Sequence, residues 1–236
     1  MLPPTDRGEL FALKKGSKMA ELLEVKNLSV SFDTPDGEAE AVRDVSFFVK
    51  KGETLAIVGE SGCGKSVLCR SIMKLLPKTA QIKSGSVLLG GKEITGLTEK
   101  EMQKLRGNSF SMVFQDPMTT LNPAMTVGAQ IAEAVIIHRP EFSREEVRRR
   151  VWELMELVGI DHPKERAAQY PWNFSGGMRQ RSVLAIALAS EPAVLLADEP
   201  TTALDVTIQA QILACFGRSR ENWGRRSCWF PMISVW

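Results

Sequence analysis

The residues best suited to chemistry form one glycine-rich octet that matches G-x-x-x-x-G-K-[ST]: Gly59-Glu60-Ser61-Gly62-Cys63-Gly64-Lys65-Ser66. In such a loop the glycines let main-chain amides point inward at phosphate oxygens, and the following helix adds its positive end. Lys65 is expected to reach the β- and γ-phosphates, and the Ser66 hydroxyl to bind Mg²⁺. An apolar run precedes the octet at 54–58 and a helical pattern follows at 67–76. This strand–loop–helix context indicates a nucleotide site rather than a chance glycine-rich turn.

Two carboxylates follow a second apolar run, at 193–197. Asp198 and Glu199 would stand at the carboxyl end of a buried strand, the edge where parallel sheets bind ligands. Asp198 can hold Mg²⁺, and Glu199 can orient and polarise an attacking water. Two solvated acids at the end of a strand are the alternative, but the upstream phosphate loop makes the catalytic interpretation the better one.

A second candidate anion site lies at Ser175-Gly176-Gly177. Ser175 is suited to cap the helix that runs on through 182–190, and the two glycines would leave bare backbone at its positive end. Taken alone, these three residues would describe an ordinary capped helix. The chain would then carry two devices that bind phosphate through main-chain amides.

The elements that must position these residues can be read from hydropathy. Strand patterns occur at 22–32, 41–49, 54–58, 84–89 and 193–197, and the composition is helical from about 97 to 169. The clearest helix spans 143–158, where Ser143 and Glu146 form a capping box before an apolar stripe. A helical block between two strand-rich halves predicts a P-loop α/β core with a helical lobe.

Composition limits the classes of partner. The chain has 236 residues, of which 44% are hydrophobic, and a net charge of +2, which is too balanced to favour nucleic acid as a partner. Its four cysteines show no metal-site spacing, and no apolar run is long enough to span a bilayer. Residues 1–18 are expected to be a disordered leader, with Met19 an alternative start. Work at a membrane would need another chain to hold this one there.

The order of the motifs resembles that of ABC-type ATPases, in particular the dipeptide and oligopeptide importer subfamily. Besides the octet, the resemblance rests on Val113-Phe114-Gln115-Asp116-Pro117, Leu121-Asn122-Pro123, FSGGMRQR at 174–181, VLLADEP at 194–200 and TALD at 202–205. It covers about residues 22–211. It implies a RecA-like P-loop NTPase core with a mainly parallel sheet, an N-terminal antiparallel β-subdomain and an inserted helical subdomain at about 97–172.

The resemblance also implies a mechanism with ATP and Mg²⁺. Two such domains meet head to tail, and each ATP lies between one P-loop and the 175–177 segment of the other chain. Gln115 is expected to sense Mg²⁺ and the attacking water near the surface where membrane subunits dock. Phe32 matches the aromatic that stacks on adenine, although a core role for it stays open. Asp205 matches the loop that couples the two sites.

Partners and location follow from the same resemblance. It implies a second ABC ATPase subunit, identical or related, together with transmembrane permease subunits and, indirectly, an extracytoplasmic solute-binding protein, but no nucleic acid. The expected place is peripheral, at the cytoplasmic face of the inner membrane. Peptide is the solute that the subfamily indicates, while nickel or another solute stays open.

The family pattern breaks near the end of the sequence. ABC-type ATPases carry a histidine about thirty residues beyond the acidic strand, whereas this chain has only His138 and His162. Residues 217–236 show no strand pattern, which suggests a frame lost near residue 214; a divergent native tail is the alternative. We therefore expect an ATP-binding domain at 19–213, an aberrant tail at 214–236 and weak turnover. A catalytically impaired remnant is the second reading; a nucleic-acid-directed ABC ATPase, a kinase and a GTPase each fit fewer motifs.

Overall fold

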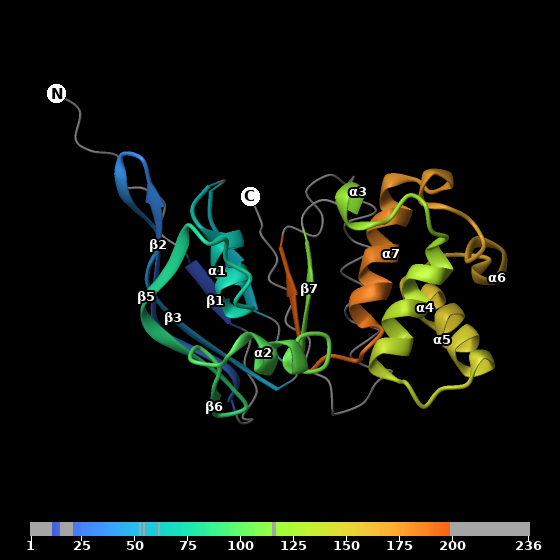
Figure 1. The fold of residues 1–236 in the computed structure, drawn as a ribbon, viewed down its shortest axis with the longest axis horizontal. Helices are drawn as coiled ribbons and strands as arrows, with labels where there is room; N and C mark the ends of the chain where they lie inside the picture. The colour runs from blue at the N-terminus through green and yellow to red at the C-terminus, as the bar shows by residue number, and fades with distance from the viewer. Residues whose placement is uncertain are drawn as a thin grey trace. The chain divides into compact units, whose positions relative to one another are not determined.

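The computed structural model describes residues 11–14, 21–51, 53, 55–60, 62–114 and 117–198. The chain divides between Arg106 and Gly107 into two compact units, each of which is described by itself. The first unit holds the strands and helices up to Arg106, and the second holds those from Gly107 onward (Figure 1).

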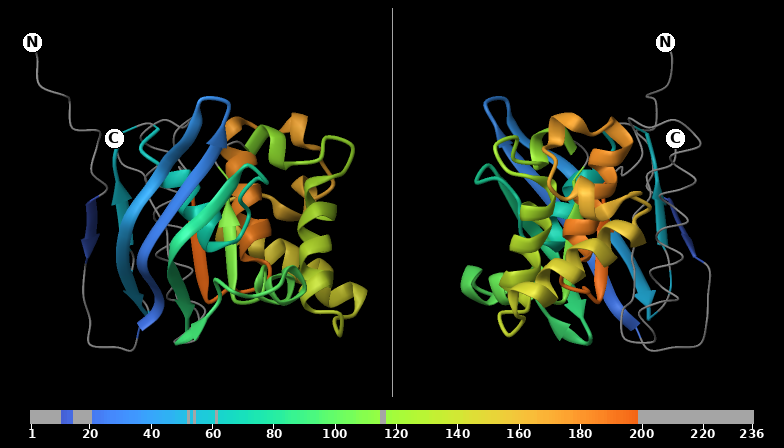
Figure 2. Two further views of the ribbon diagram at one scale, coloured as in Figure 1. Left: turned by 60° about the vertical axis from the view of Figure 1, so that its left-hand side comes forward. Right: turned by 90° about the vertical axis from the view of Figure 1, so that its right-hand side faces the viewer.

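A four-stranded antiparallel sheet dominates the first unit. Its order is β3-β2-β5-β6, formed by β2 (Glu21–Thr34), β3 (Gly37–Lys50), β5 (Ala80–Leu89) and β6 (Lys92–Glu93). β2 lies between β3 and β5 as a long ribbon, as Figure 2 shows. β2 buries Leu23 and Val25, and then Leu28 and Val30, with the period of two broken by a register shift between Val25 and Leu28. The predicted N-terminal antiparallel β-subdomain is confirmed.

The strand before the phosphate loop is β4 (Leu55–Val58), within the predicted 54–58. Its ladder in the described part of the chain is antiparallel, with β1 (Phe11–Lys14). The prediction of a disordered leader over 1–18 is therefore wrong for these four residues, which gain main-chain hydrogen bonds along β4. The signal was missed because four residues are too few to show a strand pattern.

Two helices complete the first unit. α1 (Lys65–Ile72) packs against β2 and β3 and buries Leu68, Cys69 and Ile72. α2 (Glu99–Leu105) begins with a capping box in which Thr98 accepts from Glu101 N. The helix thus starts where its sequence offers two partners for its first free amides.

A short parallel pair opens and closes the described part of the second unit. β7 (Phe110–Val113) runs parallel to β8 (Val194–Ala197), with Phe110 opposite Val194 and Val113 opposite Ala197. The prediction of continuous helical composition from 97 to 169 is wrong at β7. The strand is only four residues long, and it forms by pairing with β8, a partner that the local sequence does not show.

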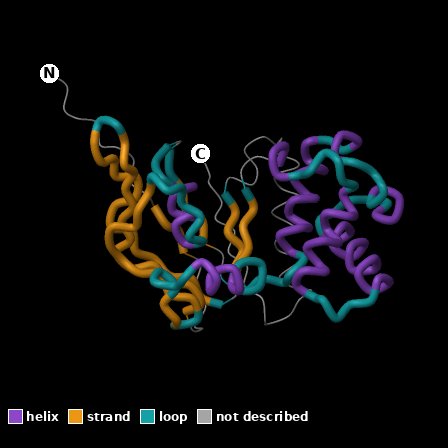
Figure 3. The backbone as a smooth tube through the Cα atoms, in the orientation of Figure 1, coloured by secondary structure: helices purple, strands orange, loops and turns teal. Residues whose placement is uncertain are grey.

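Between β7 and β8 the described part of the sequence forms helices and no strand. Of these helices, α4, α5 and α7 lie side by side (Figure 3). The helices of this interval are α3 (Pro117–Thr120), α4 (Val127–His138), α5 (Arg144–Leu157), α6 (Pro163–Arg166), the 3-10 turn η1 (Pro171–Asn173) and α7 (Gly176–Leu188). α5 carries the predicted Ser143–Glu146 capping box. Its buried Leu154 and Met155 join α4 and α7 in one apolar cluster. The helical lobe is thus confirmed, but it follows β7.

Among the helices in the described ranges, none combines the length and the hydropathy that a membrane crossing requires.

Candidate nucleotide site

The phosphate loop joins β4 to α1 in the first unit. Gly62 and Gly64 have φ values of 82° and 95°, which residues other than glycine rarely adopt. Gly64 directly precedes the first turn of α1. Leu68 N donates to Gly64 O at 2.9 Å, so the helix begins directly at the loop. The first amides of α1 have no side-chain cap. A helix that starts directly after a glycine-rich loop, without a side-chain cap, is the arrangement that the motif predicts for binding an anion.

Lys65 closes the loop from inside. Its Nζ donates to Gly59 O at 2.7 Å and to Glu60 O at 2.6 Å, and lies 3.6 Å from Cys63 Sγ. Lys65 is only 6% exposed, and these hydrogen bonds hold its ammonium group against the main chain of the phosphate loop. Because thiol sulfur is a weak acceptor, a phosphate oxygen could take over the third N–H at little cost. This is the geometry expected for a lysine that binds the outer phosphates.

The loop rests on the antiparallel sheet. A Cβ atom at Gly64 would collide with the carbonyl oxygen of Ala41 and reach Val42 Cγ2 at 3.7 Å, so only glycine fits. Phe32 of β2 pairs with Ala39, two residues before Ala41 on β3, and with Ala80 of β5. Its half-buried ring therefore belongs to the same end of the sheet as the loop. That placement is compatible with the adenine-stacking role and leaves the core role open.

Charged side chains surround this end of the sheet. Lys83 and Glu38 form an ion pair at 2.9 Å. The hydrogen bond from Lys83, followed by one from Ser31, lowers the pKa of Glu38, and the same ion pair raises the pKa of Lys83. Both side chains are solvent-exposed, so the pair is a feature of the rim rather than a catalytic acid and base.

The acidic strand end lies in the second unit. All four residues of β8 are buried, and Asp198, which follows them, is 2% exposed. Asp198 N donates to Val113 O at 2.9 Å, which extends the parallel pairing by one residue. The C-terminal ends of β7 and β8 therefore lie at one edge, so the chain leaves the sheet toward Gln115 beside the point where it leaves toward Glu199. Gln115 and Glu199 themselves, like Ser61 and Asp205, lie outside the described residues.

The second predicted anion site is the N-terminus of α7. Ser175 caps α7, and its Oγ accepts from Met178 N at 3.3 Å. Ser175 and Gly176 are exposed, and a Cβ atom at Gly176 would meet nothing within 4 Å. The first turn contains no acidic side chain. Backbone N–H groups at the start of a thirteen-residue helix can thus receive an anion from outside the chain.

The donor set suits magnesium better than a transition metal. The candidate ligands described here, the Ser66 hydroxyl and the Asp198 carboxylate, are hard oxygen donors. In the part of the chain that the structure describes, no three His, Cys, Asp or Glu residues gather as a metal cluster. Mg²⁺ needs no such cluster, because it binds through one or two protein oxygens together with phosphates and water.

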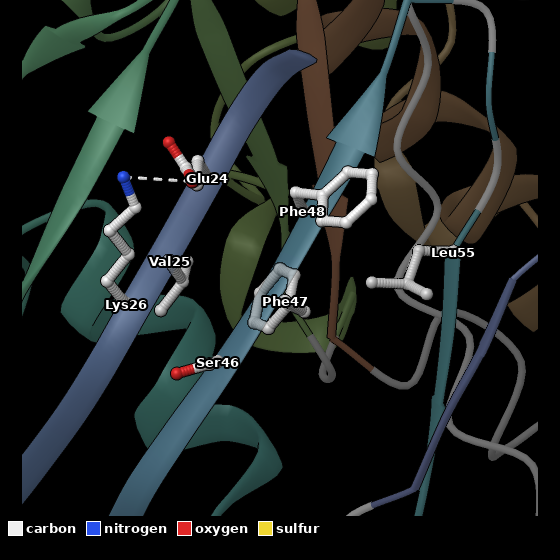
Figure 4. Close-up of a pocket in the computed structure, with 7 residues that line it drawn as sticks. All are labelled: Glu24, Val25, Lys26, Ser46, Phe47, Phe48 and Leu55. Atoms are coloured by element: carbon white, nitrogen blue, oxygen red, sulfur yellow. Dashed lines mark ion pairs between the residues drawn. The ribbon is translucent and has the colours of Figure 1, made fainter. Parts of the chain in front are cut away.

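A cavity of 340 Å³ lies apart from these residues, in the first unit (Figure 4). It opens between β2, β3 and β4 and is lined by Glu24, Val25, Lys26, Ser46, Phe47, Phe48 and Leu55. None of the predicted site residues lines it. Since the phosphate loop contributes no residue to its lining, this cavity is not the predicted nucleotide site.

Two features that support the site escaped sequence reasoning. The contact between Gly64 and Ala41 joins residues that are far apart in the chain. Arg179 Nε donates to Pro171 O at 2.8 Å, and so ties the turn before Ser175 to the helix after it. An arginine one turn inside a capped helix is the one local sign that could have suggested the second contact.

The sequence of the chain is similar to a known family and to known proteins. Residues 42–202, more than half of the chain, match the family described as ABC transporter. The oligopeptide transport ATP-binding protein OppD of Bacillus subtilis is 57% identical over 197 residues, which are 83% of this chain and 55% of that protein. The dipeptide transport ATP-binding protein DppD of the same organism is 56% identical over 84% of this chain and 59% of its own length. The chain thus spans less than two thirds of these relatives.

Solved structures give the same result. The ATP-binding cassette MJ0796, in a dimeric post-hydrolysis state bound to ADP and Pi, superposes with a TM-score of 0.77 at 27% identity, covering 90% of this chain and 88% of that one. A second dimeric structure of that cassette gives 0.78. By the family match over residues 42–202 and by its similarity to these relatives, the chain belongs to the ABC transporter family.

Proposed function

We propose that this chain binds ATP with Mg²⁺ and hydrolyses it, as the nucleotide-binding subunit of an importer for dipeptides or oligopeptides. The observation that carries the ATP part is the closed phosphate loop, in which Lys65 is held by Gly59 O and Glu60 O beside the uncapped start of α1. The names of the relatives, which are peptide-transport ATP-binding proteins, support the transport part.

Each site residue has a distinct role in this proposal. The 59–66 loop binds the phosphates through its amides and Lys65, and the ring of Phe32 stacks on adenine. Ser66, Asp198 and Gln115 hold or sense Mg²⁺, which would neutralise charge on the phosphates. Glu199 takes a proton from the attacking water.

The remaining residues act between subunits. We propose that Ser175, Gly176 and Gly177 bind the ATP held by a second ATPase subunit, because Ser175 and Gly176 are exposed and Gly177 is half-buried at the start of α7. Asp205 would couple the two sites. The subunit pair would work at the cytoplasmic face of the membrane with permease subunits, supplied with solute by an extracytoplasmic binding protein.

Equilibrium binding of a fluorescent ATP analogue with Mg²⁺ tests the ATP part. Lys65→Ala should weaken binding about 10- to 100-fold, since a charge-assisted hydrogen bond contributes about 1.5–3 kcal/mol. Lys104→Ala, which removes an exposed lysine of α2, should bind as the wild type does. Equal affinity of Lys65→Ala and the wild type would refute the proposed site.

Transport needs a separate experiment. The chain would be reconstituted in liposomes with the permease and binding protein encoded beside it, and uptake of labelled dipeptide, oligopeptide and nickel compared with and without ATP. ATP-dependent uptake of either peptide supports the proposal. Uptake of nickel alone, or no difference on addition of ATP, contradicts the peptide part.

A further inference from the structure

Two aromatic rings are stacked on each other at the surface of the second unit. The rings of Tyr170 and Trp172 lie parallel, with their centroids 4.4 Å apart and an angle of 4° between their planes. Tyr170 is 37% exposed and Trp172 is 58% exposed. Because Tyr170 covers one face of the indole, the exposed area of Trp172 lies on its edges and on the opposite face. Rings of this kind, apolar and still able to hydrogen-bond, are enriched where proteins bind partners.

Hydrogen bonds fix the turn that carries the two rings. Asn173 N donates to Tyr170 O at 3.0 Å, and Tyr170 N donates to Asn173 Oδ1 at 3.4 Å. Pro171 and Phe174 are buried, and Phe174 N donates to Pro171 O at 3.0 Å. The exposed rings are therefore held by an ordered turn with a buried base, and a ligand that binds them loses little affinity to ordering them.

The same turn is bonded to the start of α7. Arg179 Nε donates to Pro171 O at 2.8 Å, across the residue that lies between the two rings. The chain then reaches Ser175, the cap of α7, within three residues of Trp172. Since each residue spans at most about 3.6 Å, the α-carbons of Trp172 and Ser175 lie within about 11 Å of each other. The ring pair and the exposed residues at the start of α7, Ser175 and Gly176, are thus neighbours.

From this arrangement we infer that Trp172, stacked on Tyr170, contacts the base of the ATP held by a second ATPase subunit, while the start of α7 receives the phosphates. The inference rests on the proposed function, which places residues 175–177 against that nucleotide. Two neighbouring features match the two ends of one ligand: the helix start suits phosphates, and an aromatic face suits a planar base. A side chain of the second subunit would match the rings but would leave the helix start unused.

Photolabelling with 8-azido-ATP and Mg²⁺ tests the inference, because the azide is on the base itself. The chain would be labelled alone and together with the ATPase subunit encoded beside it, digested with trypsin and mapped by mass spectrometry. We expect label on Tyr170 or Trp172, in the peptide 167–179, and its loss on dilution to a concentration at which the subunits separate. Label in the peptide 27–43, which contains Phe32, should survive dilution because it comes from the chain's own nucleotide.

Trp172→Ala adds a measurement of affinity. The concentration of a non-hydrolysable ATP analogue that gives half-maximal association of the subunits should rise about 5- to 100-fold, the loss expected when one base loses an aromatic partner. Trp172→Phe keeps an aromatic face and should stay close to the wild type. Ile137→Ala is the matched control, because Ile137 is a large apolar residue of α4 that is 65% exposed. It should associate as the wild type does.

Each outcome decides between contact with the base and the alternatives. Label confined to the peptide 27–43 overturns the inference, as does a Trp172→Ala variant that associates at the wild-type concentration of analogue. Weaker association of Trp172→Ala without label in 167–179 also overturns it, because the rings would then contact protein of the second subunit. If no label is prevented by excess ATP, or if ATP binds and the subunits never associate, the proposed function fails in that part and the inference fails with it.

Discussion

The carbonyl oxygen of Ala41 lies directly against the α-carbon of Gly64, so β3 of the antiparallel sheet packs against the phosphate loop. Gly64 thus meets two demands, a φ of 95° and a surface with no room for a side chain. Gly62 meets only the first, since its φ is 82° and a Cβ atom there would find open space. The two glycines of one loop are therefore required for different reasons.

Alanine at these two positions should have unequal effects. At Gly62 the cost is backbone strain of about 1–2 kcal/mol, so ATP affinity should fall about 5- to 30-fold. At Gly64 the added collision with Ala41 must displace the loop or α1, and affinity should fall more than about 100-fold. Fluorescent-nucleotide titration measures both, with circular dichroism to check the fold. Equal losses would show that the contact with Ala41 does not matter.

Asp198→Asn separates magnesium chemistry from nucleotide binding. The amide nearly matches the carboxylate in shape but carries no charge, and the loss of a metal interaction of several kcal/mol should lower kcat about 100-fold or more. Binding of ATP in EDTA should stay unchanged. The wild type in EDTA should show the same low rate as the variant. A variant that turns over faster in Mg²⁺ than the wild type does in EDTA would argue against Asp198 as the metal ligand.

The sequence predicted best what depends on contiguous residues. The phosphate loop, the Ser175 cap and the Ser143–Glu146 capping box each involve no more than eight consecutive residues. Their chemistry and their geometry are therefore both set by the local sequence. The antiparallel strands were found for the same reason, because alternation repeats along each one.

What the sequence could not predict depends on partners distant in the chain. β7 is a strand because β8 lies beside it, 84 positions further on at Phe110 and Val194, and four residues show no period. The contact of Gly64 with Ala41, 23 positions earlier in the chain, likewise leaves no local pattern. Gln115, Glu199 and Asp205 were predicted from motifs alone and stay predictions.

The capping box of α5 should contribute measurably to stability. Ser143 Oγ accepts from Glu146 N at 3.3 Å, and Glu146 Oε2 accepts from Ser143 N at 2.8 Å, a bond that lowers the pKa of Glu146. Ser143→Ala should lower the free energy of unfolding by about 1 kcal/mol, or roughly 2–4 °C in melting temperature. Glu146→Gln keeps both hydrogen bonds and should change it much less. If calorimetry gave the two variants the same melting temperature, the capping box would not be the source of the stabilisation.

His138 packs at the C-terminal end of α4 against the turn that begins the second unit. Gly107 has a φ of 77°, and a Cβ atom there would collide with the imidazole ring. Burial, and then the charge of the neighbouring Arg139, lowers the pKa of His138.

The pH dependence of stability should follow from that histidine. Since folding lowers the pKa of His138 and an unfolded histidine titrates near 6.5, the unfolded chain binds the proton first as the pH falls. The free energy of unfolding should therefore decrease below about pH 6.5, and the decrease should level off once the folded chain is protonated too. Urea unfolding at pH 7.5, 6.5 and 5.5 measures this, and His138→Gln should lose less stability over that range than the wild type. An undiminished pH effect in His138→Gln would place the origin of the effect elsewhere.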